Sequence, residues 1–479
     1  MLQAISLFAP QLLLAVTASL LLGFGVSKDK DRSILVRYIA VGLLVLFAFI
    51  GLILGQPSGE AFKGALLVNN FSHYVNMFLG LSAAAALMFS KSYFQTEKLD
   101  RYEYSVLVLY AVLGMSIMVS ANSLLSLYIG IELQSLALYV MAAFNRDSLR
   151  ASEAGLKYFV LGAISSGLLL YGSSLIYGFT GSLEFGRIAE VVSAGTTPGI
   201  IAGMVFLLCG LAFKISAAPF HMWTPDVYEG SPTPVTGFFA AAPKFAAMAL
   251  IARLVIGPFG DIITQWQQVI IVLAVLSMFV GAIGALAQTN IKRLMAYSSI
   301  ANMGYALVPL AAGSVAGVKG MLIFMTIYII TVIGVFATIL QMRLRNGMVE
   351  KINDLSGLSK SNPAMAGIFT ALLFSLIGIP PLVGFFGKWF AFYPAVEVGL
   401  TWLVVIALIA SVISAFYYIR VIKTMWFDEP TREFIRAPRI TRIIAIISVL
   451  LVLPVLILPG ISGAAIGLAE SAAQALFAQ

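Results

Sequence analysis

Long apolar runs separated by short polar connections dominate this sequence. Most runs have about 20 residues, the length that an α-helix needs to cross the hydrocarbon core of a bilayer. The pattern predicts an all-α polytopic membrane protein with about 14 transmembrane helices. The expected helices are Ser6–Val26, Ile34–Gly55, Phe71–Tyr93, Tyr104–Ala121, Ser123–Phe144, Ser152–Tyr177, Ile200–Val227, Thr233–Ile256, Ile263–Ala287, Ile291–Ala311, Val318–Leu344, Pro363–Ala395, Leu400–Trp426 and Ile440–Ala465.

Two of these runs contain prolines that interrupt a helix. Pro219 lies in the seventh run and the pair Pro380–Pro381 in the twelfth, and proline removes a helical hydrogen bond. Broken helices at corresponding places in two halves of a membrane protein indicate an inverted repeat with sites at mid-depth. We therefore expect helices 7 and 12 to be discontinuous, within two inverted five-helix repeats formed by helices 4–8 and 9–13. The expected organisation is helices 1–3 in residues 1–103, the first repeat in 104–257, the second in 258–428 and helix 14 in 429–479.

The net charge of +8 is distributed over the connections between the helices. Most Lys and Arg residues fall in the odd-numbered connections, and positive charge marks the cytoplasmic side of a membrane. Both termini are therefore expected on the other side, which is the periplasm in a bacterial inner membrane. The distribution indicates topology and gives no sign of nucleic acid as a partner. We expect the N-terminus to be the first helix and not a removable signal peptide, because it lacks a charged region and a cleavage site.

The composition argues against a redox centre or metal site in this chain. A single cysteine, Cys209, excludes an internal disulfide, a thiolate iron–sulfur cluster and a four-cysteine zinc site. The two histidines, His73 and His221, lie in different runs. The sequence contains no phosphate-binding loop, no dinucleotide fingerprint and no nucleophile constellation.

Three lysines lie inside runs that are otherwise apolar. Lys214 precedes Pro219, Lys244 follows Pro243 in the eighth run, and Lys388 follows the double proline of the twelfth. A charge at the centre of a bilayer costs about 3 kcal/mol on insertion scales, and such residues are typically functional. A charge beside interrupted backbone at membrane depth is typical of an ion pathway. The alternative is that each lysine belongs to a structural ion pair.

Glu132 is the acidic residue placed most clearly in the middle of a run. It must be protonated or have a partner, and Lys214 is the natural candidate. Moving the carboxylate, or changing its charge, would switch the lysine between holding and releasing a proton, which suits a proton relay. Lys157 would extend the row of lysines across the bundle. Its alternative role is a pair with Glu153, one turn away, in which the lysine reaches the membrane interface.

Further polar residues follow the first break closely. His221, Asp226 and Glu229 are candidates for a channel entrance, and Glu153 is a fourth candidate. Their alternative role is in helix capping or loop structure.

Four segments together resemble the proton-translocating subunit N family of bacterial respiratory complex I, the counterpart of mitochondrial subunit 2. The segments are GIELQSLALYVMAAF, KISAAPFHMWTPDVYEGSPTPVTGFFAAAPK, IKRLMAYSSIANMGY and GIPPLVGFFGKW. The motifs are shared by a wider antiporter-like group that includes subunits L and M and the Mrp-type sodium/proton antiporters. Three features favour subunit N. The lateral helix of subunit L is absent, position 388 is a lysine where subunit M typically has glutamate, and the residues of the first two segments are most similar to those of subunit N.

The resemblance implies a role for each buried charge. Glu132 would be the helix-five glutamate that modulates Lys214, the helix-seven lysine. Lys244 would be the central lysine of helix eight, and Lys388 and Lys157 would be the lysines of helices twelve and six.

The implied function is one proton-pumping module of NADH–quinone oxidoreductase in the bacterial inner membrane. The chain would hold no cofactor, and NADH, FMN, the iron–sulfur clusters and quinone would belong to partner subunits. The implied partners are subunit M, the small subunits K and J, the peripheral arm and membrane lipids.

Three other functions remain open at this point. The chain could be a subunit of an Mrp-type antiporter that exchanges sodium independently of NADH. It could be the membrane subunit of a ferredoxin- or hydrogenase-linked complex. It could also be a non-transporting scaffold whose buried charges are structural, although apolar residues would serve that purpose as well.

Overall fold

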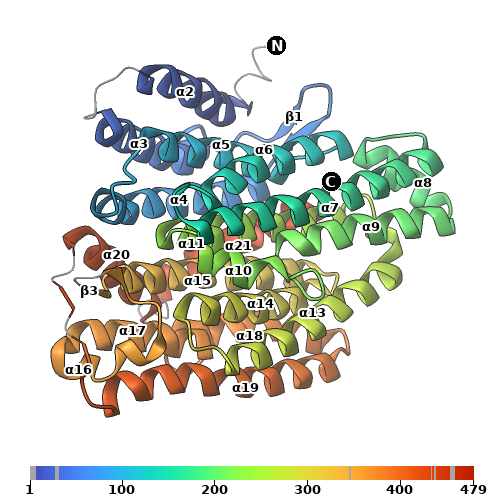
Figure 1. Cartoon of the computed structure of the whole chain (residues 1–479). Helices are drawn as coiled ribbons and strands as arrows, with labels where there is room; N and C mark the ends of the chain where they lie inside the picture. The colour runs from blue at the N-terminus through green and yellow to red at the C-terminus, as the bar shows by residue number, and fades with distance from the viewer. Residues whose placement is uncertain are drawn as a thin grey trace.

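The computed structural model describes residues 7–26, 32–344, 347–432, 434–435, 438–453 and 459–478, which form a bundle of helices (Figure 1). The longer helices of the first half are α2 (Ala9–Gly25), α3 (Arg32–Ile53), α4 (Asn70–Thr96), α5 (Tyr102–Val119), α6 (Leu124–Ala142), α7 (Leu149–Thr180), α9 (Pro198–Lys214) and α12 (Ala242–Ile256). Those of the second half are α13 (Ile263–Leu286), α14 (Ile291–Leu310), α15 (Val315–Ile339), α17 (Pro363–Ile377), α18 (Val383–Glu397), α19 (Thr401–Phe427), α20 (Arg439–Val452) and α21 (Pro459–Phe477).

Shorter elements connect these helices. They are α8 (Phe185–Ala194), α10 (Trp223–Gly230), α11 (Thr233–Ala240), α16 (Leu358–Ser361), the 3-10 turns Gly260–Ile262 and Ile352–Leu355, and the strands β1 (Gly59–Ala61), β2 (Leu66–Val68), β3 (Arg343–Leu344) and β4 (Gly347–Met348). The strands form two small antiparallel hairpins, β1–β2 and β3–β4. The predicted all-helical membrane fold is therefore confirmed. The two hairpins and the amphipathic helix α8 were not predicted from the pattern of apolar runs.

Within the described residues, nine helical segments are long and apolar enough to cross a membrane. They include α11 and α12 taken together, and shorter apolar helices such as α9 and α17 accompany them. Neighbouring helices pack closely where glycines face each other. A Cβ atom on Gly172 of α7 would lie 2.7 Å from the carbonyl oxygen of Gly203 in α9. Small residues at such contacts let helix backbones approach each other in a membrane, where packing and not the hydrophobic effect holds helices together.

The predicted interruptions of helices 7 and 12 are present. The first lies between α9, which ends at Lys214, and α10, which begins at Trp223. The second lies between α17 and α18, where Gly378 caps α17 with a φ of +89° and Pro380–Pro381 follow. Proline cannot donate the backbone hydrogen bond that a continuous helix would need at these places.

A third interruption divides the run that was expected to be one helix over Thr233–Ile256. Ala241 has φ −109° and ψ −91°, which separates α11 from α12. Pro243 follows two residues later, at the first turn of α12, where a backbone amide has no partner within its own helix. The predicted membrane span Thr233–Ile256 is therefore confirmed, but its break at Ala241 was not predicted.

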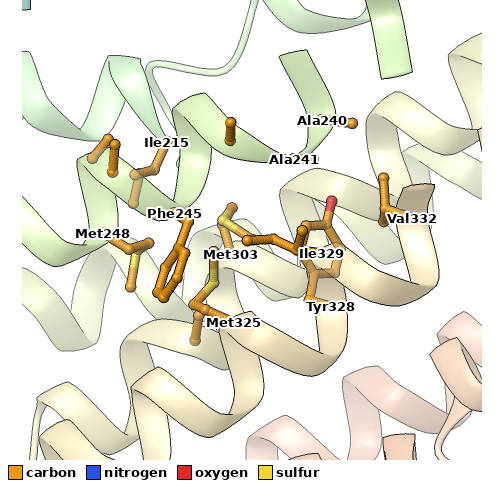
Figure 2. Packing of buried hydrophobic residues seen from close by; sticks show 14 of the residues in the cluster. Ile215, Ala240, Ala241, Phe245, Met248, Met303, Met325, Tyr328, Ile329 and Val332 are labelled. Atoms are coloured by element: carbon orange, nitrogen blue, oxygen red, sulfur yellow. The ribbon is translucent and has the colours of Figure 1, made fainter. Parts of the chain in front are cut away.

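The broken α11–α12 segment is the centre of the bundle, and its residues are almost all buried. Figure 2 shows Phe245 and Met248, which follow the break at Ala241 along the chain, packing beside Met303 and Met325. Unbranched methionine side chains fill irregular space well, which suits the surroundings of a broken helix. The centre of the molecule is therefore a tightly packed apolar wall around Lys244.

The last predicted helix, Ile440–Ala465, was also wrong as a single continuous element. The structure has α20 to Val452 and α21 from Pro459 to Phe477, and residues 454–458 of the predicted helix lie outside the described part. Both pieces follow α15 in the antiparallel direction. A Cβ atom on Gly334 would meet Ser448 of α20, and Lys319 forms an ion pair with Glu470 of α21.

Both described ends of the chain lie on the same face of the bundle. Phe8, just before α2, packs with Ala61 and Leu66 of the β1–β2 hairpin. Asn69, next to that hairpin, donates a hydrogen bond of 3.1 Å to the carbonyl oxygen of Ala475 in α21. This arrangement agrees with an even number of membrane crossings.

Candidate functional site

Lys214 is the last residue of α9 and is 7% exposed. Its Nζ donates to Ser135 Oγ at 2.7 Å and to the Tyr139 hydroxyl at 3.5 Å, both on α6. The ring centroids of Tyr139 and Phe213 lie 5.8 and 5.6 Å from Nζ. The C-terminal end of a helix carries a partial negative charge, which stabilises an ammonium group there.

Glu132 lies one turn before Ser135 on α6, but it does not form the expected ion pair with Lys214. In the part of the chain that the structure describes, no salt bridge joins the two residues. Ser166 of α7 instead donates a short hydrogen bond to the Glu132 carboxylate. The prediction of a direct pair was therefore wrong. Ser135 binds Lys214 in its place, so the hydroxyl group that holds the lysine lies one turn of α6 from Glu132.

Lys244 lies in the first turn of α12, directly after the break at Ala241, and is 1% exposed. Its Nζ donates to Ser299 Oγ of α14 at 2.6 Å, and Ser299 shares a second 2.6 Å hydrogen bond with the hydroxyl of Tyr328 on α15. The Tyr228 ring lies 5.5 Å from Nζ. The N-terminal end of a helix carries a partial positive charge, which destabilises an ammonium group there.

Lys388 contacts the end of the other broken helix. Its Nζ donates to the carbonyl oxygen of Ile377, the last residue of α17, at 2.7 Å and to Ser411 Oγ of α19 at 2.6 Å. The Tyr305 ring of α14 lies 4.8 Å from Nζ. Gly378 leaves room for this side chain, because a Cβ atom there would come 3.0 Å from Lys388 Cδ.

The three buried lysines share one property. Within the described residues, none of them forms an ion pair, and each is bound by a serine hydroxyl. The structural ion pair considered as an alternative is therefore not what holds them in this conformation. The lysines lie on α9, α12 and α18, and their serine partners on α6, α14 and α19 follow one another across the bundle in that order (Figure 1).

Further polar groups of α14 lie close along the helix to Ser299, the partner of Lys244, and to Tyr305, whose ring faces Lys388. On α14, Ser298 bonds the Tyr418 hydroxyl of α19, and the Tyr305 hydroxyl shares a 3.2 Å hydrogen bond with Ser414. Asn302 donates to the carbonyl oxygen of Ser298 at 2.8 Å. Sequence reasoning missed these residues. Their spacing of three or four residues along α14, which puts them on one face, was the signal that could have found them.

Lys157 lies apart from this buried row and is 41% exposed at its side chain. Its Nζ forms ion pairs with Glu153 at 2.8 Å and with Asp226 at 2.7 Å. Arg293 at the start of α14 binds the same Asp226 at 2.6 Å and Glu229 at 3.0 Å. We call these five residues the α10 ion cluster.

The α10 ion cluster thus contains three of the four candidate entrance residues, and it joins α7, α10 and α14. His221 lies in the segment between α9 and α10, and no ion pair of the described residues includes it. The described residues also contain no group of His, Cys, Asp and Glu side chains that could hold a metal ion.

Three comparisons place this arrangement among known proteins. The family model described as "NADH:quinone oxidoreductase/Mrp antiporter, TM" matches residues 121–414. NADH-quinone oxidoreductase subunit N of Maricaulis maris is 56% identical over 457 residues, which cover 94% of this chain and 95% of that protein.

Two solved structures are similar in fold. A chain in the structure of respiratory complex I from Thermus thermophilus with bound aureothin is 33% identical, with a TM-score of 0.82 over 94% of this chain and 97% of that one. A chain of the Mrp complex from Dietzia sp. superposes with a TM-score of 0.87 over 100% of this chain and 98% of that one. Its 20% identity shows a likeness of fold alone.

Proposed function

The chain belongs to the subunit N family of NADH-quinone oxidoreductases, and from that premise we propose that Lys214, Lys244 and Lys388, with Glu132, form its proton-translocating axis. The protein is a multi-pass membrane subunit of bacterial complex I and takes part in the reaction of that enzyme as its proton-translocating component. The proposal for these residues is supported by one observation. Three deeply buried lysines lie at or against helix breaks, and each binds a hydroxyl group in place of a carboxylate.

The helix ends suggest how a proton moves along this axis. Lys214 lies at the C-terminus of α9, and Lys388 binds a carbonyl at the C-terminus of α17, so both are placed where a positive charge is stabilised. Lys244 lies at the N-terminus of α12, where a positive charge is destabilised. A positive charge would thus be favoured at Lys214 and at Lys388 and disfavoured at Lys244 between them. Lys244 would therefore control the transfer of protons between the two halves of the chain.

Glu132 would act on Lys214 through space and through α6. Its carboxylate lies one turn from Ser135, the residue that holds the ammonium group. A carboxylate that approaches Lys214 holds its proton, and one that withdraws, or becomes protonated, favours release toward Lys244. Lys157 would lie at the edge of the axis, within the α10 ion cluster. There its ion pair with Asp226 joins α7 to α10, the second part of the first broken helix.

The membrane topology completes the proposal. Pairs such as α9–α10, α11–α12, α17–α18 and α20–α21 each count as one crossing, which gives 14 crossings over the described helices. Helices 4–8 and 9–13 would form the two inverted repeats, with both termini in the periplasm because basic residues concentrate at the other face. In this proposal residues 1–103 form helices 1–3, residues 104–257 and 258–428 form the two repeats, and residues 429–479 form helix 14.

The redox chemistry would lie elsewhere in the complex. NADH, FMN, the iron–sulfur clusters and quinone would bind partner subunits, and subunit M, the small subunits K and J and the peripheral arm would be the partners of this chain. The level of identity favours this function over an Mrp-type antiporter, because the 20% identity to the Mrp chain supports the fold only. A subunit of a ferredoxin- or hydrogenase-linked complex would share the axis but receive its electrons from another donor.

The test is proton pumping by the assembled complex carrying Lys214→Ala. In inner-membrane vesicles, we expect NADH-driven proton uptake to fall by about tenfold or more, since a positioned proton-transfer group contributes roughly 10²–10⁴-fold. NADH oxidation by an artificial electron acceptor, which reports assembly of the peripheral arm, should stay unchanged. Lys63→Ala, at an exposed lysine in the β1–β2 hairpin region, is the matched control. Normal pumping by an assembled Lys214→Ala complex would contradict the proposal.

A further inference from the structure

Arg253 is a fully buried arginine that has no part in the proton axis described above. It lies in the last turn of α12, nine residues after Lys244, and is 0% exposed. Within the described residues it belongs to no ion pair, and its Nε and Nη1 atoms have no hydrogen-bond partner. We propose that Arg253 is an electrostatic barrier that opposes the return of protons to Lys244 from the nearby face of the bundle.

The contacts of Arg253 are too weak to explain its burial as a structural tie. Its Nη2 atom donates one long hydrogen bond of 3.4 Å to Asn69 Oδ1, and its guanidinium group lies 5.5 Å from the centroid of the Phe71 ring. Asn69 Oδ1 also accepts a hydrogen bond from the backbone amide of Ser72, because Asn69 is the N-cap of α4. A buried charge is costly unless it is paired, and an apolar residue of similar volume often stabilises such a position at least as well.

Neither helix ends nor neighbouring charges neutralise Arg253. The last turn of α12 carries a partial negative charge that favours the guanidinium group, but the N-terminus of α4 at Asn69 carries a partial positive charge that opposes it. Helix α21, which contacts α12, carries Glu470, but this carboxylate forms an ion pair with Lys319 of α15 at 3.6 Å. In the described part of the chain, the positive charge of Arg253 is therefore uncompensated.

Arg253 lies toward the face of the bundle that holds both described ends of the chain. Its partner Asn69 follows the β1–β2 hairpin and also donates a hydrogen bond to the carbonyl oxygen of Ala475 in α21. The assignment of this face to the periplasm, and of Lys244 to the proton axis, comes from the proposed function, on which this inference rests. Lys244 lies about 14 Å away along the axis of α12, on the opposite side of the helix. A proton that passes along α12 between Lys244 and this face therefore approaches the guanidinium group.

A fixed positive charge suits a barrier better than a relay. A guanidinium group keeps its proton where a lysine ammonium group can lose it. Arginine side chains exclude protons and cations from aquaporin-type pores by repulsion of this kind. At an effective dielectric constant of about 20, two unit charges roughly 15–20 Å apart repel each other enough to change a population about fivefold. A pump that works against a proton gradient needs such a barrier, because periplasmic protons would otherwise flow back through the axis.

Passive proton leak through the purified complex, reconstituted in liposomes without NADH, tests the barrier directly. A potassium diffusion potential drives protons across the membrane, and a pH-sensitive dye inside the liposomes reports them. We expect Arg253→Met to raise the leak about fivefold or more, because it keeps the volume of the side chain and removes the charge. Arg253→Lys keeps the charge and should leak like the parent. A parent-like leak in Arg253→Met would overturn the proposal, and so would an equally raised leak in both variants.

Two further variants separate the barrier from general destabilisation and from a leak outside the lysine axis. Arg37 is also buried, at 1% exposed, but it forms an ion pair with Asp100, so Arg37→Met should lower the thermal stability of the complex without raising the leak. The double variant Arg253→Met, Lys244→Ala should leak like the parent, because the route needs the lysine. A raised leak in Arg37→Met or in the double variant would overturn the proposal. Failure of the axis itself would show separately, as normal NADH-driven pumping by Lys214→Ala.

Discussion

Serine hydroxyl groups are the immediate partners of the three buried lysines, and this choice has a consequence for proton transfer. A carboxylate within contact distance would hold an ammonium group strongly in a medium of low dielectric. A hydroxyl group can accept a hydrogen bond from the charged lysine and donate one to the neutral lysine, so it satisfies both forms. Ser135, Ser299 and Ser411 therefore permit each lysine to change its charge without leaving an unpaired group.

Ser299 offers the sharpest test of this idea, because it binds both Lys244 and Tyr328. Ser299→Ala removes one hydrogen bond of the central lysine, worth about 1 kcal/mol. We expect the rate of coupled proton pumping to fall several-fold while NADH oxidation by an artificial acceptor is unchanged. Ser90→Ala is a matched control, since Ser90 is buried and its hydroxyl group donates to a carbonyl of its own helix at 2.8 Å. Equal pumping by the two variants would exclude a role for the Ser299 hydroxyl.

At the level of the elements, the broken helices bring their charged ends to the lysines. A continuous helix satisfies its own carbonyls, whereas α17 ends at Ile377 and presents that carbonyl to Lys388. Gly378 makes the break possible in two ways. Its φ of +89° suits glycine, and the missing side chain leaves space for the methylene groups of Lys388.

These two roles of Gly378 can be separated by comparison with Gly399. Both have positive φ, +89° and +84°, but a Cβ atom at Gly399 would meet no other atom within 4 Å. Alanine at either position should cost stability of the order of 1 kcal/mol through backbone strain. Only Gly378→Ala should also displace Lys388 and lower proton pumping, measured in vesicles alongside the thermal stability of the complex. Equal pumping by Gly378→Ala and Gly399→Ala would mean that the lysine tolerates the displacement.

The sequence predicted the breaks at Pro219 and at Pro380–Pro381, and it missed others for physical reasons. Pro219 and Pro380–Pro381 interrupt runs far from their ends, so their effect was readable. Pro243 lies where a proline is also compatible with a helix start, and the resulting break at Ala241 was overlooked. The partners of Glu132 and Lys214 could not be predicted, because residue type gives the charge but not the rotation of α6 against α7 and α9.

The whole molecule has an apolar face on which a charged residue is partly uncovered. Glu132 is half-buried in the isolated chain, in line along α6 with Ile129 and Leu136, which are 51% and 54% exposed. A carboxylate turned toward lipid would be costly, and charged residues within a membrane almost always face protein or water. The chain is a subunit of complex I, so a neighbouring membrane subunit is the expected cover for this face.

This expectation can be tested with a cysteine at Leu136 in a background where Cys209, the only cysteine of the chain, is replaced by serine. A membrane-soluble thiol reagent should label Leu136→Cys in the chain expressed alone and at least about tenfold more slowly in the assembled complex, because packed interfaces exclude other molecules. The comparison uses the same variant in both states, so intrinsic reactivity of the thiol cancels. If labelling is equally fast in both, the α6 face is open to lipid in the complex, and Glu132 must then remain protonated or be screened by its hydrogen bond from Ser166. If labelling slows as expected, the neighbouring subunit lies close enough to change the charge of Glu132, which would give the signal from the rest of the complex a direct route to Lys214.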